Sequence, residues 1–142
     1  MVLNIKNLFK PKSIPISKEY QPGDIIAYSG DPHSEYEPHA YARVISPEEY
    51  TKLTGKPLPN AKTFLNGWGS KAVNNGFVYV KALDSGNEPF YNLMPALWIR
   101  RKVNPEHEIR WIQQETEYNI GEISSLGEYA VASIKKLANI PD

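Results

Sequence analysis

The chain has 142 residues, of which 41% are hydrophobic, and its 16 basic residues balance 16 acidic ones, so the formal net charge is zero. A chain of this length and composition is expected to fold as one domain, and it has no overall field to draw it toward nucleic acid or an anionic membrane. It contains no cysteine, which excludes disulfides, thiolate catalysis and cysteine zinc sites.

No stretch of the sequence approaches the ~20 apolar residues of a membrane-spanning helix, and the N-terminal residues do not follow the pattern of a signal peptide. We therefore expect a cytoplasmic protein with no membrane partner. The twelve prolines predict long loops and short regular elements.

Residues 1–18 are expected to form an arm that docks on the rest of the domain. The first half of this arm holds a group of five apolar residues, which is too many to leave in water: Val2, Leu3, Ile5, Leu8 and Phe9. A β-rich body at 19–103 and a helical segment at 104–142 are predicted to follow, with no linker that would split the chain into two domains.

Strands are predicted in the body where β-favouring residues run or alternate between turn signals. Asn75-Gly76 is typical of a tight hairpin turn with positive φ at the glycine, and it would join Val73 to Phe77. The expected strands are Ile25–Tyr28, Ala40–Ile45, a fragment at Thr63–Leu65, Phe77–Leu83 and Ala96–Arg101.

The segment Ser46-Pro47-Glu48-Glu49 predicts the start of a short inserted helix. Serine can cap the first N–H groups, proline suits the first helical position, and the second glutamate completes a capping box. Gly55 is expected to end this helix in the left-handed region. Tyr50 and Leu53 are expected to face inward together.

Two further helices are predicted after residue 103. Asn104 is the expected cap of the first. A strand over Glu108–Ile112 is the alternative for residues 106–118, but the alternation there is poor, so the helix is favoured. Ser125 opens a second capping box, and an apolar stripe follows it at helical spacing. The stripe consists of Leu126, Tyr129, Ala130, Ile134 and Leu137.

Short strands followed by helices predict an α+β fold. We expect a small twisted antiparallel sheet or a half-open SH3-like barrel over residues 19–103, with one short inserted helix and a C-terminal helical segment. The run Pro22-Gly23-Asp24-Ile25-Ile26 resembles the opening strand of many SH3-like barrels. This resemblance covers five residues and implies a fold, not a function.

The polar segment Ser29–Pro38 contains two prolines and is expected to be a loop outside the core. It places acidic and aromatic side chains together, which suits a basic groove on a protein partner. The predicted partner-binding residues are Tyr28, Glu35, Tyr36, Glu37 and Tyr41.

The same loop supports a second hypothesis, a metal-dependent hydrolase that uses the stretch from Asp31 to His39. Asp31, His33 and His39 would be ligands of a type that zinc, manganese or iron accepts. Ligands along one extended segment splay rather than converge, however, so a solvated loop without a metal is favoured and no cofactor is expected.

A third hypothesis is single-stranded nucleic-acid binding through the densest basic cluster of the chain. Trp98 stands beside Arg100, Arg101 and Lys102, and such a cluster can bind by charge and by stacking. The zero net charge argues against this function.

Signatures of catalysis are sparse. Gly67-Trp68-Gly69-Ser70-Lys71 lacks the spacing of a phosphate-binding loop, and no serine stands in a nucleophile elbow. We therefore predict a non-enzymatic binding protein, accessory or inhibitory, that acts through protein–protein interaction. The sequence indicates neither its partner nor its oligomeric state.

Overall fold

The computed structural model describes residues 13–29, 40–84, 86–118 and 122–141, with the backbone alone described at 115–118 and 122–126. Its strands are β1 (Ile25–Tyr28), β2 (Ala40–Ile45), β3 (Phe77–Leu83), β4 (Pro89–Pro95) and β5 (Ile99–Val103). Its helices are α2 (Pro47–Thr54), α3 (Ala61–Leu65), α4 (Ser70–Asn75), the 3₁₀ turn η1 (Ala96–Trp98), α5 (Pro105–Tyr118) and α6 (Glu122–Ala138).

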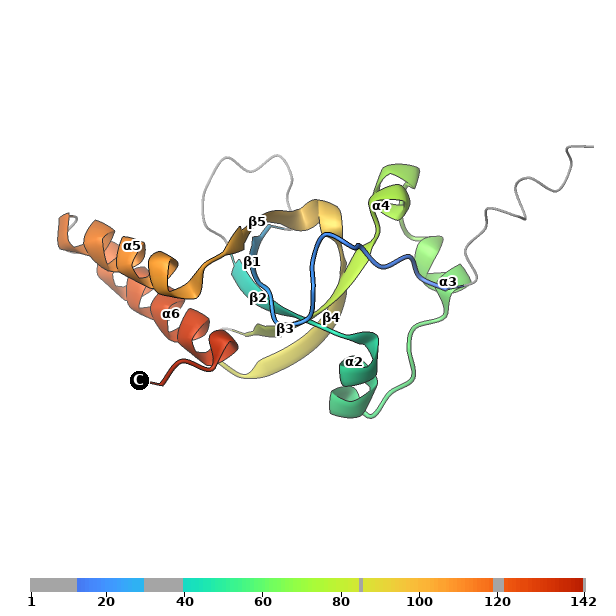
Figure 1. Ribbon diagram of the computed structural model, residues 1–142, viewed down its shortest axis with the longest axis horizontal. Helices are drawn as coiled ribbons and strands as arrows, with labels where there is room; N and C mark the ends of the chain where they lie inside the picture. The colour runs from blue at the N-terminus through green and yellow to red at the C-terminus, as the bar shows by residue number, and fades with distance from the viewer. Residues whose placement is uncertain (1–12, 30–39, 85, 119–121, 142) are drawn as a thin grey trace, which may run out of the picture.

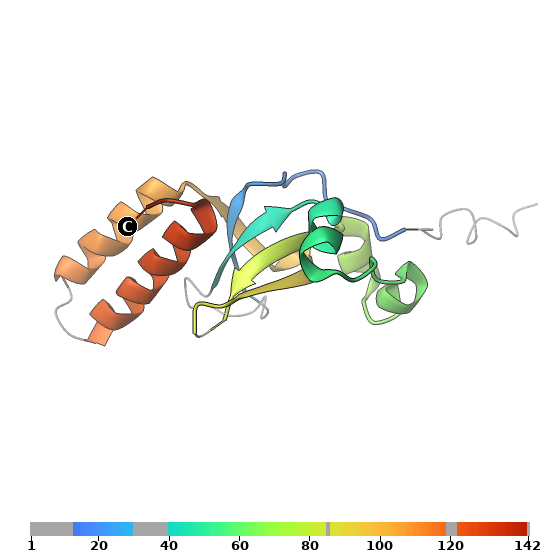
Figure 2. The same cartoon turned by 90° about the horizontal axis from the view of Figure 1, so that it is seen from below.

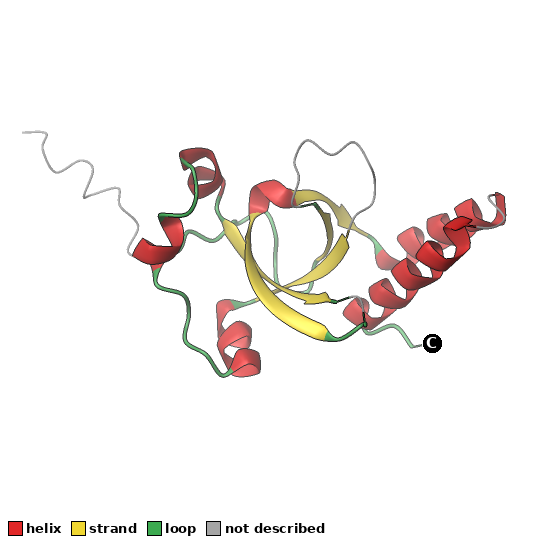
Figure 3. Ribbon diagram, turned by 180° about the vertical axis from the view of Figure 1, so that it is seen from behind, coloured by secondary structure: helices red, strands yellow, loops and turns green. Residues whose placement is uncertain are grey.

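The strands form one antiparallel sheet in the order β4-β3-β2-β1-β5. The sheet curls strongly but stays open, with β4 and β5 as its two edges (Figure 3). The predicted α+β fold with a small twisted antiparallel sheet is confirmed. The paired helices α5 and α6 extend from one end, and α2, α3 and α4 lie at the other (Figures 1 and 2).

Side-chain alternation gives the sheet an inner face, around which it curls, and an outer face that carries the helices. The inner face is packed with the sheet's own small and branched residues, and Tyr20, Tyr28 and Trp98 lie at its margin. The buried residues of this inner cluster are Ile26, Ala42, Val44, Val78, Val80, Ala82, Met94 and Ile99.

The outer face is covered at both ends by separate hydrophobic clusters. At one end Ile109 and Ile112 of α5 and Ile134 and Leu137 of α6 pack on Ile25, Ala27, Tyr41 and Val103. At the other end Ile14 and Ala61 pack with Ile45, Phe77, Tyr79 and Leu93. Between the two covers the sheet carries two half-buried cations, Arg43 and Lys81, at directly paired positions of β2 and β3.

Where β2 ends, the described part of the N-terminal arm lies beside β3 in its stead. The arm residue Ile16 pairs with Phe77 in parallel, beyond the point where β2 ends at Ile45. The Ser17 N–H donates to the Phe77 carbonyl at 2.9 Å, and the Phe77 N–H donates to the Pro15 carbonyl at 2.9 Å. Residues 13–18 of the arm therefore lie along the end of β3, while 1–12, which include the five apolar residues on which the docking prediction was based, lie outside the described residues.

Helix α2 follows its predicted caps closely. The Ser46 hydroxyl accepts the Glu49 N–H at 3.0 Å, and Gly55 ends the helix with φ of 67°. The expectation that Tyr50 and Leu53 both face inward is half wrong. Tyr50 packs on Tyr79, with 4.8 Å between ring centroids, whereas Leu53 is 45% exposed.

Two predicted elements of the connection between β2 and β3 are wrong. The segment Thr63–Leu65 belongs to helix α3, because the Asn60 side chain accepts the Thr63 N–H at 3.0 Å and caps it. The hairpin over Val73–Phe77 is instead the end of helix α4, whose Asn75 precedes Gly76. The predicted positive φ of Gly76 is confirmed at 86°. An Asn-Gly pair can end a helix as well as form a turn.

The later boundaries also differ from the sequence expectation. The strand expected at Ala96–Arg101 begins only at Ile99, because residues 96–98 form η1. Strand β4 was not predicted, since it begins and ends with proline, which an edge strand tolerates.

At the C-terminal end, helix α5 is confirmed over the alternative strand, and the Asn104 side chain accepts the His107 N–H at 3.1 Å as its cap. Ser125 lies inside α6 rather than at its start, because that helix begins at Glu122. None of the helices in the described ranges is long and apolar enough to span a membrane.

A substitution at Gly76 tests how closely the N-terminal arm packs on the start of β3. A Cβ at this position would lie 3.0 Å from the Ser17 nitrogen and 3.3 Å from the Pro15 oxygen. The backbone of Gly76, with φ of 86° and ψ of −178°, is also one that only glycine adopts readily. We expect Gly76→Ala to lower the free energy of unfolding by about 1–3 kcal/mol in urea melts. Gly69→Ala is the control, because a Cβ there meets nothing within 4 Å, and equal losses in both variants would contradict the close approach.

Candidate functional site

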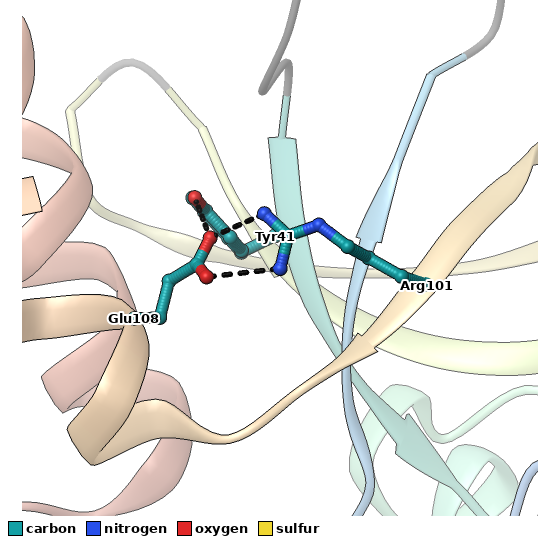
Figure 4. A network of polar contacts seen from close by, with 3 residues as sticks. All are labelled: Tyr41, Arg101 and Glu108. Carbon is teal, nitrogen blue, oxygen red and sulfur yellow. Dashed lines mark hydrogen bonds and ion pairs between the residues drawn. The ribbon is translucent and has the colours of Figure 1, made fainter. Parts of the chain in front are cut away.

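The buried carboxylate of Glu108 in α5 accepts hydrogen bonds from two side chains of the sheet (Figure 4). The Arg101 guanidinium of β5 donates to both oxygens of this carboxylate, at 2.9 Å and 2.6 Å. The Tyr41 hydroxyl of β2 donates to the same group at 2.7 Å. The three residues join α5 to two strands of the sheet.

The proton affinities of the network reflect these contacts. Burial alone would raise the pKa of Glu108, but the hydrogen bonds from Arg101 and Tyr41 and the positive charge of Arg101 outweigh it and hold the pKa below its ordinary value. Burial raises the pKa of Tyr41 well above 10.0, and the hydrogen bond to Glu108 and its negative charge raise it further. The network is therefore a neutral tyrosine with an ionised pair at neutral pH, and its role is to hold the helices on the sheet.

The structure does not bring Tyr28 and Tyr41 together. Tyr28 packs beside the inner face, and burial raises its pKa. Tyr41 is on the outer face and buried in the Glu108 network. The other predicted partner-binding residues, Glu35, Tyr36 and Glu37, lie outside the described residues.

The predicted metal ligands Asp31, His33 and His39 also lie outside the described residues. Within the described part of the chain no three potential ligands of the histidine, cysteine, aspartate and glutamate type come close enough to hold a metal ion.

The predicted basic cluster is divided by its strand. Arg101 points to Glu108 in α5, and Trp98 is half-buried against Trp68 with 5.6 Å between ring centroids. Arg100 and Lys102 are exposed. The Lys102 Nζ lies 3.6 Å from the Asp24 carboxylate, and it also lies 5.7 Å from the centre of the Tyr20 ring.

An apolar groove lies at the opposite end of the molecule from the helix pair. It has a volume of about 470 Å³ and runs between the arm, the start of α2 and the loop before α3. Its floor includes Ile14, which is 8% exposed, and Tyr79, which is 2% exposed. The side chains that line it are Ser13, Ile14, Ile16, Pro47, Glu48, Leu58, Pro59, Ala61 and Tyr79.

The rim of this apolar groove carries large aliphatic side chains that the fold leaves open to solvent. Ile16 is 40% exposed and Leu58 is 45% exposed. Sequence analysis did not find the groove, because its lining comes from four segments that are far apart in the chain. The one local signal was the pair of prolines, Pro57 and Pro59, around Leu58 in an otherwise polar loop.

Comparison with known protein families, with curated proteins and with solved structures finds no match for this chain.

The Glu108 network makes a prediction about stability and pH. Glu108→Gln removes the charge that pairs with Arg101, and we expect the free energy of unfolding at pH 7 to fall by about 2 kcal/mol. The pKa of Glu108 is depressed in the folded chain, so its contribution is complete above the unfolded value near 4.5 and is lost as pH falls through the folded pKa.

Urea melts from pH 7 to pH 3 measure this effect. The stability difference between the native chain and Glu108→Gln should therefore shrink on acidification. Glu106→Gln is the matched control, because Glu106 is exposed on the same helix. A difference that does not change with pH would show that the carboxylate charge is not the cause.

Proposed function

We propose that this chain is a non-enzymatic binding protein, accessory or inhibitory to its target, and that the apolar groove receives an extended apolar segment of a protein partner. The observation that carries the proposal is the rim of the groove, where Ile16 and Leu58 expose aliphatic surface beside a buried floor. Contiguous exposed apolar surface of this kind is typical of interaction sites. The absence of cysteine is compatible with action in the reducing cytoplasm, where we propose that it works.

The lining of the groove suits association better than chemistry. Most of the lining is isoleucine, leucine, proline and alanine, which supply contact area and cannot transfer a proton, and its polar side chains are those of Ser13, Glu48 and Tyr79. Full burial of an aliphatic side chain contributes about 1.5–3 kcal/mol. Ile16 and Leu58 are already partly buried, so a partner that covers them gains only part of this free energy from each. Further contacts with the floor and rim are needed to reach micromolar affinity, about 8 kcal/mol.

Two features of the groove define its partner further. Pro47 and Pro59 limit the motion of the walls, which lowers the entropic cost of binding. Glu48 is exposed at the start of α2 and is the one charged residue of the lining, next to the exposed Glu49. We therefore propose a partner segment that combines aliphatic or aromatic residues with a lysine or arginine.

The proposal is tested with peptides selected from a random phage-displayed library against the full chain. We expect apolar sequences with a basic residue, binding with Kd of about 1–100 µM by fluorescence anisotropy. Leu58→Asp should weaken binding by about tenfold or more, because it places a charge against the apolar ligand. Circular dichroism should show an intact fold, since the substituted side chain is exposed.

Leu53→Asp is the matched control. Leu53 and Leu58 are both 45% exposed, but only Leu58 lines the groove. Binding to Leu53→Asp should stay close to that of the native chain. Equal effects of the two variants, or selection of acidic peptides without apolar residues, would rule the groove out as the site.

The loop predicted from the sequence is a second candidate surface for the same function. Its test is the triple variant Glu35→Lys, Tyr36→Ala and Glu37→Lys, measured with the selected peptides. We expect the affinity of a groove peptide to be unchanged. Loss of binding in the triple variant, together with native binding by Leu58→Asp, would place the interface on the loop.

A further inference from the structure

We infer that a second site, an open cleft between the end of α6 and the sheet, binds a small phosphorylated molecule. The cleft has a volume of about 570 Å³, which is within the usual range of ligand pockets. Ile25 and Val103 give it apolar walls, Arg43 and Lys102 supply positive charge, and Asp24 is the one carboxylate of the lining. It is separate from the apolar groove and does not depend on the function proposed there.

Arg43 is held in place at this cleft. One guanidinium nitrogen, Nη1, donates to the Leu137 carbonyl at 3.1 Å, close to the negative end of the α6 dipole. A guanidinium has five N–H groups in a rigid fork. Anchoring one nitrogen therefore orients the group and leaves further donors for a ligand.

The positive charge around Arg43 is not balanced by the sheet. Lys81 is its direct partner across β2 and β3, and like charges at such positions destabilise a sheet. No carboxylate among the described residues forms an ion pair with either Arg43 or Lys81. A bound anion would relieve this repulsion.

Lys102 also lines the cleft. Its ammonium lies 3.6 Å from Asp24, which is beyond hydrogen-bond distance, and its side chain is 55% exposed. An exposed pair of this kind contributes little to stability. The ammonium can therefore turn to an incoming phosphate at small cost.

The size of the cleft indicates what accompanies the phosphate. A single inorganic ion would fill a small part of about 570 Å³, and Ile25 and Val103 would gain nothing from it. A phosphate monoester with an apolar or aromatic body uses both the cations and the apolar walls. Its phosphate can form charge-assisted hydrogen bonds to arginine and lysine.

Binding is measured on the full chain by isothermal titration calorimetry with phenyl phosphate, inorganic phosphate and benzyl alcohol. We expect saturable binding of phenyl phosphate with Kd of about 1 mM or tighter, weaker binding of inorganic phosphate and none of benzyl alcohol. Lys102→Gln should weaken the binding of phenyl phosphate by about fivefold or more, which is the effect of one lost charge-assisted contact. Lys81 is paired with Arg43 but does not line the cleft, so Lys81→Gln should weaken binding less. Arg43→Lys keeps the positive charge but loses the planar guanidinium with its several N–H donors, so it should also weaken the binding of phenyl phosphate.

Two controls separate this site from other surfaces. Lys62→Gln removes an exposed lysine of α3 that does not line the cleft, and Leu58→Asp alters only the groove, so both should bind phenyl phosphate as the native chain does. Equal binding by the native chain and Lys102→Gln, or no saturable binding, would overturn the inference. Tighter binding of oligo(dT) with a steep salt dependence would overturn it in favour of a nucleic-acid surface on β5.

Discussion

A carboxylate as deeply buried as that of Glu108 is tolerated only when its oxygens are fully bonded. Arg101 comes from β5 and Tyr41 from β2, with β1 between them in the sheet. The hydrogen bonds to the Glu108 carboxylate therefore hold α5 against three strands. Helix α6 is held in place with it, because α6 packs on α5. The Tyr129 hydroxyl of α6, which donates to the Asp84 carbonyl at 2.7 Å, holds the other side of the helix pair to the turn after β3.

The position of the helix pair determines which part of the outer face is left for binding. The pair covers one end of that face, and the arm with α2, α3 and α4 covers the other. The row of Val103, Ile25, Arg43 and Lys81 crosses the sheet. The helix pair covers Val103 and Ile25, whereas Arg43 is half-buried and lines the cleft beside α6. The cleft and the apolar groove both lie where an element that covers the outer face meets the sheet, so neither is formed by a single sequence motif.

The features that could be predicted from the sequence are those with local causes. The caps of α2 at Ser46 and Gly55 are local, and so is the alternation of Phe77–Leu83, and both are confirmed. The pair Asn75-Gly76 is compatible with a hairpin and with a helix end, and only the arm passing over Gly76 distinguishes them. The groove could not be predicted, because Ile16 and Leu58 become neighbours only after the arm pairs with β3.

Although the net charge of the chain is zero, positive and negative side chains are separated along β2 and the helix that follows it. Arg43 lies in the strand beside the cleft, and Glu48 lies a few residues later at the apolar groove. The segment from β2 to α2 thus places a cation at the cleft and a carboxylate at the apolar groove. Each cavity is lined by its own charged side chains, Arg43 and Lys102 at the cleft and Glu48 at the groove. On the two proposals made above, a chain of zero net charge would bind an anion at one site and a basic segment at the other.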